Sequence, residues 1–280
     1  LSLNKIIENV NLSENVVRMV LEAPAIAQKR KAGQFIVLKI NEKGERIPLT
    51  IVDSDAQKGT ITIIFQIVGK TTAQLAGMKA GESLQDVQGP LGNPTEIEKY
   101  GRVVCVGGGV GVGVVYPLIV ALKKAGNEVV SIIGSRTKDL LILEKEVGEN
   151  SDRLVVTTDD GSYGVHGFVS NVLQEMIDKG EKIDRVFAIG PVPMMRVVCD
   201  VTKPHGIKTI VSLNSIMVDA TGMCGACRVA VAGKTKFACV DGPEFDGHEV
   251  DFKLLANRLK MYCDQEREAY EQHKCGCDGN

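Results

Sequence analysis

The sequence predicts a protein of three parts: an antiparallel β-barrel over residues 1–95, an α/β parallel-sheet domain over 96–213, and a small C-terminal cysteine module over 214–280. Three observations lead to this prediction. Short β-branched runs separated by Gly and Pro fill the first part, as in antiparallel strands. Apolar strands then alternate with helical segments, which indicates a parallel sheet covered on both faces. Finally, three cysteines follow within one short, glycine-rich segment.

Length and charge narrow the classes of function. A chain of 280 residues is long for one compact core and fits two or more domains. The net charge of −2 provides no broad basic field, so we expect no nucleic acid and no membrane surface as a partner. The chain has no run of roughly 18 apolar residues and no signal-peptide pattern at its start, so we predict a cytoplasmic location.

Eight cysteines are present, and their grouping favours metal or redox chemistry over disulfides in a cytoplasmic protein. Cys105 and Cys199 lie inside apolar runs and are expected to be buried as small hydrophobic residues. Cys263 falls in a polar helical stretch. For Cys275 and Cys277 we prefer a frayed chain end over a second metal or redox pair.

Two motifs in the first part could bind an anion. In Arg46-Ile-Pro48-Leu49-Thr50, Pro fixes the backbone between a guanidinium and a hydroxyl that can both contact a phosphate, although this pattern alone is a weak signal. In Gly69-Lys-Thr71-Thr72, a strand end passes through Gly into a short helix whose free N–H groups favour an anion. An ordinary threonine helix cap is the alternative for the second motif.

In their order and spacing, these motifs and Gly33-Gln34-Phe35 resemble the FAD-binding barrel of the ferredoxin-NADP reductase superfamily. The resemblance implies that the Arg and Thr of the first motif hold the flavin pyrophosphate. It also implies that a strand end passes beside the isoalloxazine ring and that the threonine pair caps the phosphates. The FAD-binding residues so implied are Arg46, Pro48, Leu49, Thr50, Gln66, Ile67, Gly69, Thr71 and Thr72.

The second part begins with a strand that runs into a glycine-rich turn and then a helix containing Pro117. Such a turn lets a pyrophosphate approach the N–H groups at the helix start. The turn does not satisfy the G-x-G-x-x-G fingerprint, but it resembles the G-G-x-G-x-x...P turn of the same superfamily. Its candidate nucleotide-binding residues are Gly107, Gly108, Gly109 and Gly111.

Further candidates lie where the next strands end, the edge at which parallel sheets bind nucleotides. They are Ser135, Arg136, Asp160, Gly190 and Pro191. The Ser-Arg pair does not by itself decide whether the domain binds NAD or NADP. Similar chains with a G-x-R-x-K-D stretch use NAD(H). The superfamily's usual Cys before Gly-Pro is replaced by Ile189. We therefore assign no catalytic thiol, and no acid or base, because hydride transfer needs only a nicotinamide stacked on a flavin.

The cysteine segment has the spacing of a plant-type iron–sulfur site, C-x4-C-x2-C with a distant fourth Cys, but with Asp in the first position. The predicted ligands are Asp219, Cys224, Cys227 and Cys239. A hairpin over residues 227–240 is expected to carry the last ligand back toward the others. Zinc is the alternative for this set, but a zinc ribbon has two C-x-x-C knuckles and only one exists here. We therefore favour a [2Fe-2S] cluster.

The order of barrel, nucleotide domain and cysteine module resembles the electron-transfer subunits of two-subunit flavoenzymes. One branch of that family, the electron transfer subunit of dihydroorotate dehydrogenase, has four Cys in this module. The other branch has Asp as its first ligand and is the small subunit of the electron-bifurcating NADH-dependent ferredoxin:NADP+ oxidoreductase, also described as sulfide dehydrogenase. Asp219 favours the second branch.

That resemblance implies FAD, a [2Fe-2S] cluster and NAD(H) as cofactors of an oxidoreductase. It also implies a partner, a larger flavoprotein subunit with its own FAD and [4Fe-4S] clusters, similar to the small subunit of glutamate synthase. The partner would pass one electron to ferredoxin and the other through this chain to NAD+, and the direction of flow stays open. The helical stretch 252–274 would dock that partner or form a solvated terminal helix. Outside catalysis, a zinc-stabilised nucleotide-binding regulator is the remaining hypothesis.

Overall fold

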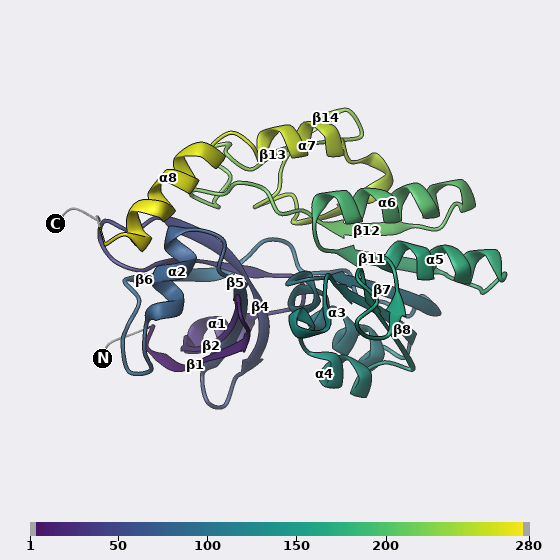
Figure 1. Ribbon diagram of the computed structural model, residues 1–280, viewed down its shortest axis with the longest axis horizontal. Helices are drawn as coiled ribbons and strands as arrows, with labels where there is room; N and C mark the ends of the chain where they lie inside the picture. The colour runs from purple at the N-terminus through teal and green to yellow at the C-terminus, as the bar shows by residue number, and fades with distance from the viewer. Residues whose placement is uncertain (1–3, 277–280) are drawn as a thin grey trace.

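Two large sheets and a two-stranded hairpin make up the computed structural model, which describes residues 4–276. In Figure 1 the first sheet lies on the left in purple and blue, and the second lies on the right in teal and green. The yellow-green C-terminal segment runs across the top of both. The last part of the chain therefore contacts the elements built by the two parts before it.

The first sheet is antiparallel throughout, and its side chains on one face form a separate core around Ile51, Ile61 and Ile63. Its strands, in spatial order, are β1 (Ile6–Ser13), β2 (Val16–Glu22), β5 (Thr60–Gln66), β4 (Arg46–Asp55), β3 (Phe35–Lys39) and β6 (Asp86–Leu91). The start of β1 also bonds to the segment that precedes β6, through Ile6 N to Glu82 O at 2.8 Å. Two helices accompany this sheet, α1 (Pro24–Lys29) and α2 (Lys70–Gly77).

Strands β4 and β5 pair for only part of their length. Residues 51–55 of β4 pair with 60–63 of β5, whereas residues 46–50 pair with β3 on the other side. The end of β5 pairs instead with β2. The two strands therefore separate between Thr50 and Gln66. Pro48 suits the unpaired stretch because proline has no N–H to donate to a second neighbour.

The second sheet contains six parallel strands and one antiparallel edge strand. In spatial order these are β10 (Val165–His166), β9 (Arg153–Thr158), β8 (Glu128–Ser135), β7 (Arg102–Gly108), β11 (Arg185–Ile189), β12 (Thr209–Ser212) and β15 (Glu244–Asp246). The edge strand β15 comes from the C-terminal segment, and no pattern in the sequence predicts it. The C-terminal segment is thus built into the second sheet.

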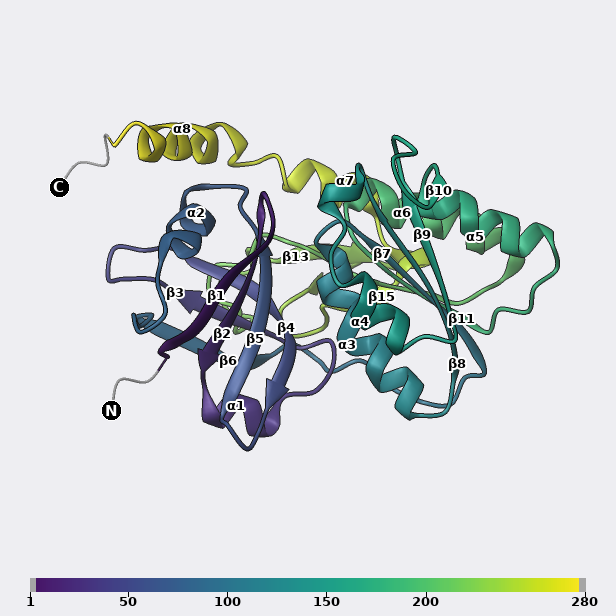
Figure 2. The same cartoon turned by 60° about the horizontal axis from the view of Figure 1, so that its bottom comes forward.

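Helices cover both faces of the second sheet, as Figure 2 shows. α3 (Gly111–Lys124) and α4 (Glu144–Glu149) pack on one face, and α5 (Val169–Asp178) and α6 (Val192–Thr202) on the other. Cys105 and Cys199 are buried in these two cores, as predicted. Burial raises the pKa of Cys199 to about 12 and that of Cys105 further, so both thiols stay protonated at neutral pH.

The predicted cysteine hairpin is present as β13 (Arg228–Val231) and β14 (Lys234–Phe237). The stretch predicted as one helical segment forms two helices, α7 (Phe252–Arg258) and α8 (Cys263–Lys274). α8 lies over α2 of the first sheet (Figures 1 and 2). Cys277 lies outside the described residues. None of the helices in the described range is both long enough and apolar enough to cross a membrane.

Buried Asn127 joins the chain that enters the second sheet to the end of α3. Its Oδ1 accepts from the backbone N–H groups of Tyr100 and Gly101, at 2.7 and 3.1 Å. Its Nδ2 donates to the carbonyls of Glu98 and Leu122, at 2.8 and 2.9 Å. One side chain therefore satisfies four backbone groups.

We expect Asn127→Ala to lower the free energy of unfolding by about 3 kcal/mol, because a buried polar group without a partner costs roughly 1–3 kcal/mol. Urea unfolding followed by circular dichroism measures the change. Asn150→Ala is the matched control, since the Asn150 side chain donates to Glu146 O near the surface, and its loss should cost well under half as much. Equal losses in the two variants would contradict this role of Asn127.

Candidate functional site

The residues predicted to bind flavin line the separation of β4 and β5. Arg46 begins β4, and its Nη2 lies 3.3 Å from Asp86 Oδ2, with about a third of each side chain exposed. Gln66 and Ile67 stand where β5 ends on the other side of the separation, Gln66 exposed and Ile67 half-buried. The backbone here is unpaired along one side, and a cation stands at its entrance. This arrangement suits an extended ligand that carries a phosphate.

The predicted phosphate caps at α2 already have protein partners. Thr72 Oγ1 accepts from the N–H groups of Val68 and Gly69, at 3.0 and 3.1 Å. Gly69 is the N-cap residue, so Thr72 caps the start of α2 from the third helical position, as the residue at that position does in a capping box. Thr71 Oγ1 donates to Glu45 Oε2 at 2.8 Å. A phosphate held by Thr71 would have to take the place of this carboxylate.

The glycine-rich turn packs directly on the turn that follows β11. A Cβ on Gly111 would lie 2.4 Å from Ile189 O and 2.8 Å from the Cα of Gly190. A Cβ on Gly108 would lie 2.4 Å from the sulfur of Met194. The structure therefore brings together two of the segments predicted to bind nucleotide, and side chains at these positions would separate them.

Gly109 has a different role in the same turn. Its N–H donates to Gly134 O at 2.8 Å, which ties the turn to the end of β8. It adopts a φ of +55°, and the space that a side chain would fill is open. This open space beside the start of α3 lets a ligand approach the backbone closely.

The first turn of α3 lies against the first sheet. A Cβ on Gly113 would lie 3.3 Å from the Cβ of Ile64, a residue close to the end of β5. The start of α3 and the separated end of β5 are therefore neighbours. A dinucleotide on the turn and a flavin in the separation would meet at this contact.

The predicted adenosine end of the site contains one exposed cation and one anion. Ser135 is buried, and its hydroxyl donates to Thr137 O at 2.6 Å, whereas Arg136 is exposed. The N–H of Asp160 donates to Arg136 O at 3.2 Å. Hydrogen bonds from the hydroxyl and the backbone N–H of Ser162 lower the pKa of Asp160, so its carboxyl is ionised at neutral pH.

Two of the four predicted cluster ligands lie together. The Sγ atoms of Cys227 and Cys239 are 3.1 Å apart, and both residues are 2% exposed. Burial, followed by the neighbouring Cys227, raises the pKa of Cys239 to about 12. Cys224 is exposed, and its pKa is lowered by the backbone N–H groups of Ala226 and then Asp219. The carboxylate of Asp219 accepts from the Thr221 hydroxyl.

Across residues 4–276, no group of three or more His, Cys, Asp or Glu side chains is close enough to hold a metal ion. The donors nevertheless fit an iron–sulfur cluster in their chemistry. Two thiols are buried in contact, a third lies on the adjoining loop, and backbone N–H groups point at the sulfurs, as in sites where hydrogen bonds to sulfur set the potential. The structure thus brings together Cys227 and Cys239 of the predicted ligand set. Asp219 and Cys224 lie on the neighbouring loop, half-buried and exposed respectively.

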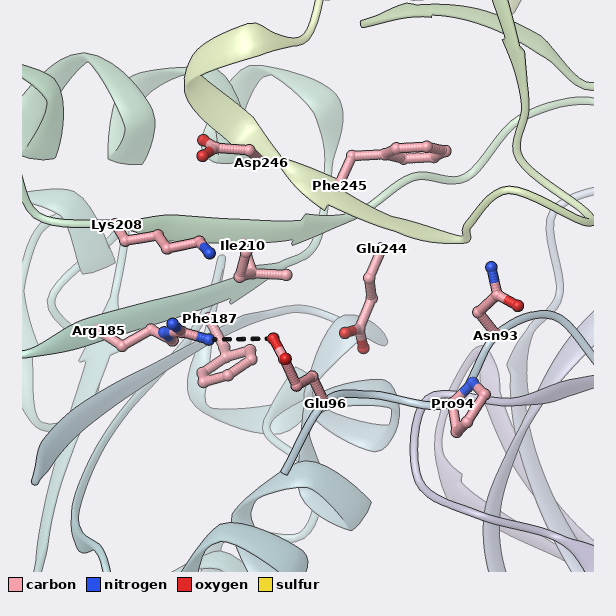
Figure 3. Close-up of a pocket in the computed structure, with 10 residues that line it drawn as sticks. All are labelled: Asn93, Pro94, Glu96, Arg185, Phe187, Lys208, Ile210, Glu244, Phe245 and Asp246. Carbon is pink, nitrogen blue, oxygen red and sulfur yellow. Dashed lines mark ion pairs between the residues drawn. The ribbon is translucent and has the colours of Figure 1, made fainter. Parts of the chain in front are cut away.

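A cavity of about 260 Å³ that the sequence did not indicate lies between the linker that follows β6 and the strands β11, β12 and β15 of the second sheet (Figure 3). It is lined by Asn93, Pro94, Glu96, Arg185, Phe187, Lys208, Ile210, Glu244, Phe245 and Asp246. The carboxyl of Glu244 points inward, and its Oε1 accepts from the hydroxyl of Thr95 at 2.7 Å. Burial raises the pKa of Glu244 to about 7, against the opposing effect of that hydrogen bond.

Two protein-family models match the chain. The oxidoreductase FAD-binding domain matches residues 4–95, and the iron–sulfur cluster binding domain of dihydroorotate dehydrogenase B matches residues 214–251. These matches confirm the prediction of FAD and an iron–sulfur cluster as cofactors. They also favour iron over zinc at the cysteines.

Similar proteins cover nearly the whole chain. The dihydroorotate dehydrogenase B (NAD(+)) electron transfer subunit homolog of Thermotoga maritima is 47% identical over 97% of this chain and 95% of its own. The electron transfer subunit of Geobacillus thermodenitrificans is 34% identical over 85% of this chain and 94% of its own.

Solved structures agree with the fold. A chain from the NADH-dependent reduced ferredoxin-NADP oxidoreductase, a structure described for its insights into flavin-based electron bifurcation, superimposes with a TM-score of 0.93. It is 46% identical to this chain, with 98% of both covered. A ferredoxin NADP+ reductase from Neisseria gonorrhoeae with bound FAD and NADP, 19% identical with a TM-score of 0.58, shares the fold over 72% of this chain and 90% of its own. The predicted reductase-like fold is thereby confirmed.

We expect Gly111→Ala to weaken NADH binding and to destabilise the fold, because its methyl group would displace the backbone at Ile189 and Gly190. The expected loss in affinity is roughly tenfold or more, which corresponds to about 1.4 kcal/mol of binding free energy. Titration of the purified chain with NADH measures it. Gly77→Ala, at the end of α2 with open space around it, is the matched control and should change neither property appreciably. Wild-type affinity in Gly111→Ala would refute the assignment of this turn.

Proposed function

We propose that this chain, which belongs to the family of dihydroorotate dehydrogenase B electron transfer subunits and their homologs, serves a flavin-based electron-bifurcating NADH-dependent reduced ferredoxin:NADP+ oxidoreductase. It would be the subunit that passes electrons between a [2Fe-2S] cluster, FAD and NAD(H). The observation that carries this choice is Asp219 in the first ligand position, where the pyrimidine branch has Cys. The likeness to the solved bifurcating oxidoreductase over 98% of the chain supports it.

In this proposal the first part, predicted as an antiparallel β-barrel over residues 1–95, holds FAD along the separation of β4 and β5. Arg46 and Thr50 hold the pyrophosphate, and Pro48 and Leu49 keep the intervening backbone extended beside it. Gln66 and Ile67 border the ring from β5. Because Thr72 caps α2, the contribution of Gly69, Thr71 and Thr72 is to fix the start of that helix at the phosphates.

The second part, residues 96–213, would bind NAD(H) at the carboxyl ends of its parallel strands. N–H groups of the glycine turn receive the dinucleotide pyrophosphate. Arg136 and Asp160 border the adenosine end, where the carboxylate favours the ribose hydroxyls of NAD over a 2'-phosphate. Gly190 and Pro191 border the nicotinamide end. Because Gly113 lies close to Ile64, a nicotinamide bound at the start of α3 would lie near a flavin bound beside β5.

Residues 214–280 would hold the cluster through Asp219, Cys224, Cys227 and Cys239. FAD, when bound, exchanges two electrons with a nicotinamide and single electrons with an iron–sulfur centre. The residues of this chain bind and orient the cofactors and exclude water, and we assign no catalytic acid or base. The cytoplasmic location stays a prediction from the sequence.

The proposed partner is a larger flavoprotein subunit with FAD and [4Fe-4S] clusters, similar to the small subunit of glutamate synthase, through which ferredoxin is reached. The alternative is an electron transfer subunit of dihydroorotate dehydrogenase, which the names of the similar proteins and the cluster-domain match favour. The two functions differ in the second chain. That difference makes the partner the decisive observation.

Purification of this chain from its native source under anaerobic, low-salt conditions should retain that partner. We expect a co-purifying flavoprotein with iron–sulfur clusters, and a complex that reduces NADP+ when supplied with NADH and reduced ferredoxin together, but with neither alone. Mass spectrometry and the coupled assay provide the two measurements. A dihydroorotate-oxidising partner would refute the proposal in favour of the alternative.

Substitution of Asp219 tests the cluster ligand directly. Asp219→Ala should retain iron and sulfide against a chelator roughly tenfold more weakly or worse, because a ligand is lost. Asp219→Cys should keep the cluster but change its absorption spectrum and potential, because a thiolate replaces a carboxylate. Asp200→Ala removes an exposed carboxylate on α6 and serves as the control. An unchanged spectrum and potential in both Asp219 variants would rule out ligation by this residue.

A further inference from the structure

Glu244 stands where the three parts of the chain meet. It belongs to β15, its hydrogen-bond partner Thr95 belongs to the linker between the sheets, and Gly33 of the first part approaches both. Gly33 has a φ of +83°, and a Cβ there would lie 2.2 Å from Thr95 Oγ1 and 3.0 Å from Glu244 Oε1. Only glycine fits at this position, so the contact between the carboxyl and the hydroxyl is closely enclosed.

The same linker holds the backbone that follows Cys239. Asn93 N donates to Gly242 O at 2.7 Å, and Asn93 Nδ2 donates to Val240 O at 3.1 Å. β15 is in turn paired with β12, with Glu244 opposite Ser212. The carboxyl of Glu244 therefore lies at the end of a short, hydrogen-bonded connection from a predicted cluster ligand.

The charged groups around Glu244 do not neutralise it. Arg185 lies 3.7 Å from Glu96 and 3.7 Å over the ring of Tyr100. In the described part of the chain no cation forms an ion pair with Glu244. Other titratable and charged side chains line the cavity or have a pKa that the charge of Glu244 raises. They are Glu96, Tyr100, Cys105, Arg185, Lys208 and Asp246.

We propose that Glu244 is a positioning and proton-accepting residue for electron transfer in this chain. With Thr95 it holds the segment after Cys239 against the linker, and its carboxylate would accept one proton from solvent that enters the cavity when a cluster held at Cys239 is reduced. This inference rests on the proposed function, since it requires a cluster bound at Cys239. The electron comes from NADH through FAD, or from the partner subunit. The proton forms an O–H bond on the carboxylate, and no bond of the protein breaks.

The chemistry of the site supports proton uptake. A buried carboxyl group favours its neutral form, because burial removes the water that stabilises the charge. With its pKa raised to about 7, Glu244 is partly ionised at neutral pH, so one added negative charge nearby shifts its occupancy. The carboxyls of Asp152, Asp160 and Asp184 have lowered pKa values instead and stay ionised through this range.

Redox titration of the full chain, loaded with flavin and cluster, tests the coupling. Between about pH 6 and about pH 8, the cluster potential of the wild type should fall as pH rises, and that of Glu244→Gln should not change. Thr95→Val should move this window to higher pH, because the Thr95 hydroxyl lowers the pKa of Glu244. Glu96→Gln removes a more exposed carboxylate from the same cavity and should keep the wild-type dependence.

Unfolding of the same full chain provides a readout that does not depend on activity. In the unfolded chain Glu244 ionises near its ordinary pKa, so the folded state holds more protons between about pH 5 and about pH 7. The free energy of unfolding should therefore fall as pH rises through this window and level off above it. Glu244→Gln should remove this fall, whereas Glu96→Gln should keep it.

Three results would overturn the inference: a wild-type cluster potential independent of pH, the same pH dependence in Glu244→Gln, or a stability slope that survives that substitution. A chain that binds neither flavin nor iron would instead refute the proposed function. In that case the unfolding measurement would still decide whether Glu244 titrates as proposed. The two failures are therefore distinguishable.

Discussion

The hydrogen bonds between the linker and the chain after Cys239 fix the place of the cysteine hairpin relative to both sheets. Asn93 supplies two of them, and Thr95 adds a third through Glu244. Because β15 also completes the edge of the second sheet, the three parts share a single junction. Electron transfer between the proposed cofactors requires fixed separations, and directional hydrogen bonds provide them better than a non-directional apolar contact would.

The proposed cofactor sites lie at interruptions of regular structure. β4 pairs with β5 only from Ile51 onward, which leaves one side of the backbone before Ile51 available to a ligand. The glycine turn follows the end of β7. Gly111 of this turn can pack against Gly190 because neither of these two residues has a side chain. The contact of Gly113 with Ile64 then places the two interruptions side by side. Hydride transfer by stacking needs this proximity more than it needs any reactive side chain.

Much of this arrangement could be predicted from local patterns. The burial of Cys105 and Cys199 followed from their apolar neighbours, and the hairpin before Cys239 followed from a glycine between two short strands. The strand β15 could not be predicted, because three residues carry no periodicity and their pairing with β12 is a tertiary contact. Glu244 was missed for a related reason. A glutamate in a polar segment is expected to be exposed, and only the fold encloses it.

The two halves of the proposed cluster site are held in different ways, and this difference suits the proposed replacement of Cys by Asp at one position. Cys227 and Cys239 flank the hairpin, where Ala238 N donates to Cys227 O at 3.1 Å. Asp219 precedes a loop in which Ala220 and Gly222 adopt left-handed conformations with φ of 61° and 83°. A ligand held by strand pairing must match one geometry, whereas a loop ligand can adjust its backbone to a longer carboxylate. A carboxylate at the proposed first ligand position therefore needs no change in the hairpin that carries Cys227 and Cys239.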